Sequence, residues 1–173
     1  MKRRILAAGI CIVMAVSFCG CGTKAADSPE STTVAAGSGQ QIANPVVDCG
    51  NDMEKAAKIT GFKLKLPALS NYSISVIGGN VIEVKFPKDE STDIFFRKSE
   101  TEVQNFSGIY LSTKPVTETF NQGVEVQAQI ENGKYYSLTF GAEDGYFCVG
   151  CTKGLSKDEM YSYLKELYDS NKK

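Results

Sequence analysis

The chain of 173 residues contains no histidine and no tryptophan. The lack of histidine excludes Ser-His-Asp and Cys-His catalysis, histidine-ligated zinc and a histidine pH switch. The lack of tryptophan means that nine Phe and eight Tyr residues have to supply the large pieces of the core. The paired carboxylates Glu143-Asp144 and Asp158-Glu159 lie at an expected turn and at an expected helix start, so they predict no glycosidase-like pair. The composition points away from an enzyme, and no cofactor is expected.

The chain also lacks an excess of basic charge, with 19 Lys and Arg residues against 20 Asp and Glu residues. Lys2, Arg3 and Arg4 stand at the extreme N-terminus, so the remainder of the chain is net acidic. Nucleic acids and anionic membrane surfaces are bound through basic surfaces. The charge balance therefore predicts no nucleic-acid partner and no polybasic membrane-binding surface.

Long hydrophobic runs are missing as well, except for the uncharged residues 5–18, which are too few to span a bilayer comfortably. This run follows the basic residues and leads into a Gly placed directly before Cys21. The order is typical of a bacterial lipoprotein signal, with residues 1–20 as the signal peptide and Cys21 as the acylated N-terminus. A plain secretory signal with a later cleavage site is the alternative.

The segment after Cys21 has almost no large apolar side chains and is rich in Ser, Thr, Ala and Gly. Such a stretch cannot bury enough surface to offset the entropy of ordering it. We therefore expect the lipidated cysteine and a flexible tether in residues 21–43, followed by one domain in residues 44–173. The predicted location is the extracytoplasmic face of the cell membrane.

Short strands dominate the middle of the sequence. The expected strands are residues 73–77, 81–86, 93–98, 116–120, 124–130, 135–140 and 146–151. Residues 62–66 alternate in the same way before Pro67. The short connections permit only antiparallel neighbours, and the polar residues on one side of most strands predict one wet sheet face.

Two helices complete the predicted fold. A short one is expected at residues 53–59, where Asp52 or the preceding Asn51 supplies the cap. The C-terminal helix begins at a capping box of Ser156 and Glu159 and carries an apolar stripe. The prediction is an α+β fold: a curved, meander-like antiparallel sheet of about six or seven strands, with both helices on one face.

Five short motifs occur in a recognisable order along this domain. They are Asn44-Pro45, residues 54–58 with the following Gly61-Phe62 and Pro67, residues 94–98, residues 106–110 and residues 154–160. In this order and spacing they resemble a domain of unknown function in secreted lipoproteins and membrane-anchored envelope proteins of Gram-positive, often anaerobic, bacteria. The resemblance covers about residues 44–167. It implies the fold and an extracytoplasmic setting, and it brings no enzymatic activity or catalytic residues.

Three cysteines lie in the predicted domain: Cys49, and Cys148 and Cys151 in a CxxC motif. Outside the cell, a disulfide from Cys49 to Cys148 or Cys151 is the expected arrangement, and three buried, unpaired thiols are the alternative. A surface thiol oxidoreductase stays open as an enzymatic hypothesis, although this CxxC ends a strand instead of opening a helix. No metal site is expected, because a fourth ligand is missing.

Tyr110, Tyr135 and Arg97 are the candidate residues of a binding face. Tyrosines on a wet sheet face stack on sugars or hold a peptide, whereas Tyr136 alternates with Leu138 and is expected in the core. Arg97, beside acidic residues, suits either an anion site or a charged edge strand that discourages aggregation.

The leading functional hypothesis is a non-enzymatic binding or sensing module, held at the membrane by its N-terminal lipid. The expected partners are another envelope protein, a peptide, or a component of the cell wall or membrane. A carrier of lipids or other hydrophobic ligands is an alternative, with a cavity lined by Phe86, Phe96, Val126 and Phe140.

Overall fold

The structure is a computed structural model, and it describes residues 44–172. The predicted signal peptide, the lipidation site Cys21 and the predicted tether lie outside the described residues. Within residues 44–172, no helix is both long and apolar enough to cross a membrane. The predicted α+β fold is confirmed, since the described residues form one open antiparallel sheet of eight strands and two helices.

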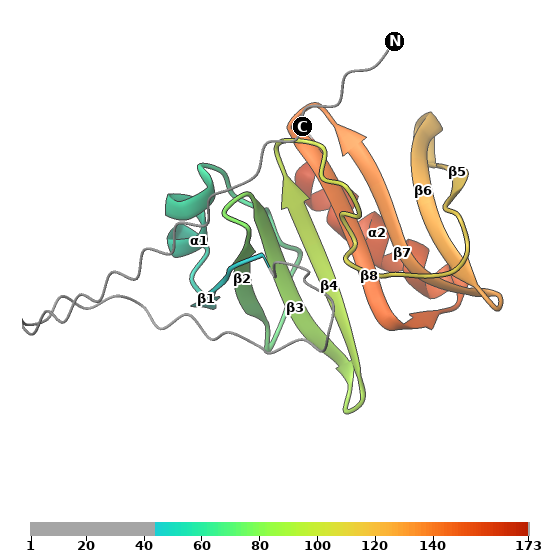
Figure 1. The fold of residues 1–173 in the computed structure, drawn as a ribbon, viewed down its shortest axis with the longest axis horizontal. Coiled ribbons are helices and arrows are strands. Elements are labelled where there is room, and N and C mark those ends of the chain that lie inside the picture. The colour runs from blue at the N-terminus through green and yellow to red at the C-terminus, as the bar shows by residue number, and fades with distance from the viewer. Residues whose placement is uncertain (1–43, 173) are drawn as a thin grey trace, which may run out of the picture. The chain divides into compact units, whose positions relative to one another are not determined.

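The strands lie side by side in the order β1-β2-β3-β4-β8-β7-β6-β5 (Figure 1). Their bounds are β1 (Val46–Gly50), β2 (Ser73–Ile77), β3 (Val81–Asp89), β4 (Thr92–Ser99), β5 (Val116–Phe120), β6 (Val124–Glu131), β7 (Lys134–Ala142) and β8 (Gly145–Leu155). A 3-10 turn, Asn121–Gly123, joins β5 to β6. The sheet is two meanders, β1 to β4 and β5 to β8, that meet where β4 pairs with β8. The last strand therefore lies in the middle of the sheet.

The first helix, α1 (Met53–Thr60), forms where it is predicted. The Asp52 side chain accepts a hydrogen bond from the first turn, and Gly61 ends the helix in the left-handed conformation, with φ 88°. The alternating residues 62–66 form no strand, although Leu64 is buried in the core. The strand that the pattern missed is β1, which pairs with β2 at the edge of the sheet.

The second helix, α2 (Lys157–Asn171), begins at the predicted capping box of Ser156 and Glu159. Its apolar stripe covers β7 and β8, and its fully buried residues are Met160, Leu164 and Leu167. Together with α1 it closes one face of the sheet, which we call the helix face. The main core lies there and includes Ile74, Val84, Phe96, Leu138 and Phe147. Full burial of each such side chain contributes about 1.5–3 kcal/mol.

A β-bulge in β7 decides which tyrosine enters this core. The register between β6 and β7 shifts, because Gln129 pairs with Ser137 and the next residue, Ile130, pairs with Tyr135, so Tyr136 is the extra residue. Tyr135 therefore joins Leu138 on the helix face and is 8% exposed, while Tyr136 is half-buried. The prediction that Tyr136 is the core residue and Tyr135 lies on the wet face is wrong for this reason.

The connection from β4 to β5 crosses the opposite face of the sheet. We call residues 100–115 the strap and the face that they cross the strap face. Figure 1 shows the strap passing in front of β8 and β7, with α2 behind them. Phe106 of the strap packs with Val81, Phe95 and Cys148 in a second, smaller core. The face that the sequence predicts to be wet is thus partly covered.

Candidate functional site

A groove of about 720 Å³ lies on the strap face. It is lined by residues 102–107 of the strap and by residues of three strands, among them Gln127, Gln129, Ser137, Thr139 and Tyr146. These side chains come from one face because successive side chains of a strand alternate between faces. The same alternation in the sequence predicts a wet face, and this part of the expectation agrees with the structure.

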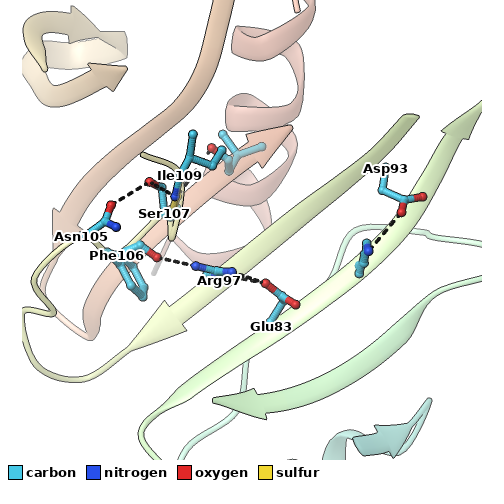
Figure 2. Close-up of polar contacts among 10 residues, drawn as sticks. Glu83, Asp93, Arg97, Asn105, Phe106, Ser107 and Ile109 are labelled. Atoms are coloured by element: carbon cyan, nitrogen blue, oxygen red, sulfur yellow. Dashed lines mark hydrogen bonds and ion pairs between the residues drawn. The ribbon is translucent and has the colours of Figure 1, made fainter. Parts of the chain in front are cut away.

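Arg97 of β4 fastens the strap to the sheet (Figure 2). Its Nη1 donates to the carbonyl oxygen of Phe106 at 2.8 Å, and its Nε donates to Oε2 of Glu83 at 2.7 Å. The guanidinium carbon lies 4.6 Å from the centre of the Phe95 ring. Only 15% of the Arg97 side chain and 18% of the Glu83 side chain are exposed. This ion pair is therefore shielded from water, and it fixes the backbone of the strap beside the groove.

Gln129 of β6 provides a second attachment for the strap. Its Oε1 accepts hydrogen bonds from the hydroxyl groups of Ser107 and Ser137, both at 2.8 Å. Its Nε2 donates to the carbonyl oxygen of Ile109 at 3.3 Å, and the Ile109 N–H donates to Ser107 Oγ at 3.1 Å. Figure 2 shows the contact between Ser107 and Ile109 within the strap. One amide side chain thus joins the strap to two strands.

Asn105 is the one residue of the described chain with a buried side-chain polar atom that has no hydrogen-bond partner, and this atom is Nδ2. The residue is in the left-handed conformation, with φ 50°, and it lines the groove. Its Oδ1 accepts only a long hydrogen bond of 3.4 Å from Ser107 Oγ. An unpaired buried donor costs about 1–3 kcal/mol. Residues in disfavoured backbone conformations cluster at active sites and ligand clamps, and an unpaired buried donor calls for an explanation of the same kind.

The three residues predicted for a binding face do not come together. Tyr110 lies on the strap, is 76% exposed and stands outside the groove. Tyr135 lies on the helix face, where its hydroxyl donates to Glu118 at 2.8 Å. Arg97 lies on the strap face, but its guanidinium already binds a carboxylate and a carbonyl, and β4 is a central strand rather than an edge. The sequence does not single out the groove residues of the strap, because the strap has no periodic pattern.

The predicted disulfide is not formed. Cys49, Cys148 and Cys151 are all unpaired and buried. Cys49 lies in the edge strand β1, four strand positions from β8, which corresponds to about 19 Å. The Cα atoms of a disulfide are only about 4.4–6.8 Å apart. Cys148 and Cys151 share β8 but face the strap-face core and the helix-face core, respectively. The alternative of three buried thiols describes the structure.

The CxxC motif offers little chemistry in this setting. Cys148 is buried, and burial raises the pKa of its thiol to about 11. Both thiol exchange and metal binding require the thiolate, which is scarce at neutral pH when the pKa is raised. Within residues 44–172, no group of three His, Cys, Asp or Glu side chains is placed to hold a metal ion.

A polar cluster away from the groove joins β5 to α2. Glu118 accepts hydrogen bonds from the hydroxyls of Tyr135 at 2.8 Å and Tyr161 at 2.6 Å, and Lys157 Nζ lies 3.0 Å from its carboxylate. Burial, and then the bond to Glu118, raises the pKa of Tyr161. Each of these side chains has its partner within the cluster, so the cluster acts as a structural junction.

No family model, no curated protein and no solved structure matches this chain. The resemblance to an envelope domain of Gram-positive bacteria therefore stays a prediction. The function has to be inferred from the groove and from the N-terminal sequence.

Proposed function

We propose that this chain is a lipid-anchored protein of the extracytoplasmic face of the cell membrane that binds a ligand in the groove without catalysing a reaction. The basic N-terminus, the short uncharged run and Cys21 support the anchoring. Another envelope protein, a peptide or a cell-wall component would supply the ligand. A nucleic-acid partner is opposed by the acidic balance of the chain.

The groove is the observation that carries the binding role. Ligand sites are concave and combine apolar surface with a few placed polar groups, and they are usually formed before the ligand arrives. Here the strap is held in place by two sets of bonds. The first, which we call the clamp, joins Arg97 to Glu83 and to the carbonyl oxygen of Phe106. The second joins Gln129 to Ser107 and Ile109. Because the wall is already ordered, a ligand loses less free energy in ordering it.

The hydrophobic-carrier alternative requires a cavity under the helices. The rings of Phe86 and Phe96 instead pack edge to face, with their centres 5.0 Å apart. Phe140 stacks on Phe147, with the ring centres 5.2 Å apart. Val126 is fully buried among them. These side chains fill the helix-face core, so a carrier would have to open it. The oxidoreductase alternative is opposed by the burial of both thiols of the CxxC motif.

Anchoring is tested with the full chain in a Gram-positive host that is fed an alkyne-tagged fatty acid. We expect the chain to carry the label and to stay with the membrane fraction. The Cys21→Ser variant should lose both properties. A labelled Cys21→Ser chain, or a wild-type chain that is secreted without label, contradicts the proposal.

Binding is tested by ¹H–¹⁵N NMR on residues 22–173, which contain all the described residues. The probes are neutral oligosaccharides, acidic oligosaccharides, short peptides and a fatty acid. Shifts concentrated on the amides of Gln127, Thr139 and Tyr146 support a groove ligand. Shifts confined to the helix face, or no shift with any probe, contradict it.

A further inference from the structure

The floor of the groove offers hydrogen bonds from side chains and not from open backbone. The strands β6, β7 and β8 are each paired on both sides, so their ladder groups are already used. A peptide that binds by adding a strand needs an open strand edge, and the groove floor has none. The floor therefore suits a ligand that is recognised by amide, hydroxyl and carboxylate side chains.

The charges of the groove argue against an anionic ligand. Glu102 and Glu125 line it, and no Lys or Arg is among the described residues that do. The guanidinium of Arg97, which holds the strap beside the groove, is engaged by Glu83. An anion in the groove would meet like charges without a counter-charge. The two carboxylates would gain little from a cation, because both belong to exposed residues.

Tyr146 adds an apolar surface to these polar groups. Its ring lies across Gly141, where an added Cβ would be 3.6 Å from the ring. The residue is half-buried, so part of the ring remains accessible from the groove. The side-chain amides of Gln127 and Asn105 line the same groove as this ring. A groove that combines an aromatic surface with amides matches a pyranose ring, which has an apolar C–H face and hydroxyls around its edge.

We propose that the groove binds an uncharged saccharide, with a sugar ring against Tyr146 and its hydroxyls on the side-chain amides of Gln127 and Asn105. This inference rests on the proposed binding role of the groove and gives it a ligand class. A sugar hydroxyl can both donate and accept, so it can pair with either end of an amide.

Replacement of Asn105 by glycine distinguishes a binding role of this residue from a structural one. Its Nδ2 is enclosed, so a small movement of the strap has to accompany its bond to a sugar oxygen. In the unbound protein, the left-handed backbone and the unpaired donor both disfavour this residue. Glycine at this position removes both costs. A residue that only supported the fold would not improve stability when it is replaced in this way.

The test is a titration of residues 22–173, followed by ¹H–¹⁵N NMR, with cellotriose, maltotriose and N,N′,N″-triacetylchitotriose. Trigalacturonate is the acidic counterpart, and trialanine is the peptide counterpart. We expect at least one neutral trisaccharide to shift the amides of Gln127, Thr139 and Tyr146. Tyr146→Ala should weaken that binding about fivefold, as expected for the loss of one aromatic contact. Tyr110→Ala is the matched control, because it removes an exposed tyrosine of the strap that lies outside the groove.

Asn105→Gly should weaken the same binding while the melting temperature stays equal or rises. Binding of trialanine or trigalacturonate in the groove, without binding of a neutral sugar, overturns the saccharide inference and leaves the binding role intact. A groove that responds to none of the probes contradicts both the saccharide inference and the proposed binding role. Equal weakening by Tyr110→Ala and Tyr146→Ala also overturns the inference, because it moves the site out of the groove.

Discussion

Replacement of Arg97 by methionine should free the strap without unfolding the sheet. The variant keeps an apolar stem over Phe95 but removes the guanidinium that binds Glu83 and the carbonyl oxygen of Phe106. Breaking a fully buried ion pair costs about 3–5 kcal/mol. Both side chains here retain some exposure, so we expect a loss of about 2–3 kcal/mol in the free energy of unfolding.

The same strand pair offers a matched control. Lys85 and Asp93 form an ion pair of 3.1 Å, with 51% and 45% of their side chains exposed. Figure 2 shows that Asp93 lies apart from Arg97, nearer the start of β4. Because an exposed pair is well solvated, Lys85→Met should cost less than about 0.5 kcal/mol. The contrast between the two variants isolates the effect of burial.

Urea unfolding measures both losses, and amide hydrogen exchange locates them. We expect Arg97→Met to speed exchange at Gly108 and Ile109, whose N–H groups bond within the strap. A double variant with Glu83→Leu should lose less than the sum of the two single variants, with a coupling of at least about 1 kcal/mol. Equal losses for Arg97→Met and Lys85→Met, with unchanged exchange in the strap, would refute the clamp.

Three further predictions concern the core and its dependence on pH. Gly150→Ala should cost about 1–3 kcal/mol in urea unfolding, because its Cβ would lie 2.2 Å from the Phe95 ring, and Phe95→Leu should restore part of the loss. Hydrogen bonds from Lys88 and then Ser156 lower the pKa of Glu159 to about 2, so its contribution to stability should be lost as the pH falls from about 4.5 to about 2. Thermal melts should show a smaller acid loss for Glu159→Gln over this range, and an equal loss would contradict the assignment. Burial raises the pKa of Cys148 to about 11, so stability should fall by about 2 kcal/mol as the pH rises from 9 to 11, and Cys148→Ala should lose less over that range.

Local patterns in the sequence account for most of the elements. Alternation located β6, whose Val126 and Ala128 enter the core while Gln127 faces the groove. The capping box of Ser156 located the start of α2. Signals of this kind depend on neighbours two to four residues apart, so they can be read without knowledge of the fold.

The order of the strands could not be read in this way. The pairing of β4 with β8 joins Arg97 to Cys148, and no local period specifies such a distant neighbour. The predicted disulfide was wrong for the same reason, since it assumed that Cys49 lies against the last strand. The bulge at Tyr136 reversed the assignment of the two tyrosines, because a one-residue slip exchanges the faces of a strand.

The candidate site was only half predictable. The polar side of β6 and β7 identified a wet face, but the strap that turns this face into a groove has no periodic pattern. Its clamp is a contact between Arg97 and a backbone carbonyl, and any residue at position 106 would supply that carbonyl. The aromatic residues chosen from the sequence were the most conspicuous ones, whereas the groove uses amides and Tyr146.

The topology explains why the groove is on the strap face. After β4 the chain has to reach β5, four strand positions away, which is about 19 Å. Residues 100–115 would span roughly 50 Å if fully extended, so the strap is much longer than its path requires. Turns absorb the excess length, with left-handed backbone at Asn105 and Gly108. A segment with this excess can shift at Asn105 without pulling on β4 or β5, whereas α2 is held to the helix face by a continuous buried stripe. A movement that admits a ligand is therefore easier beneath the strap than beneath the helices.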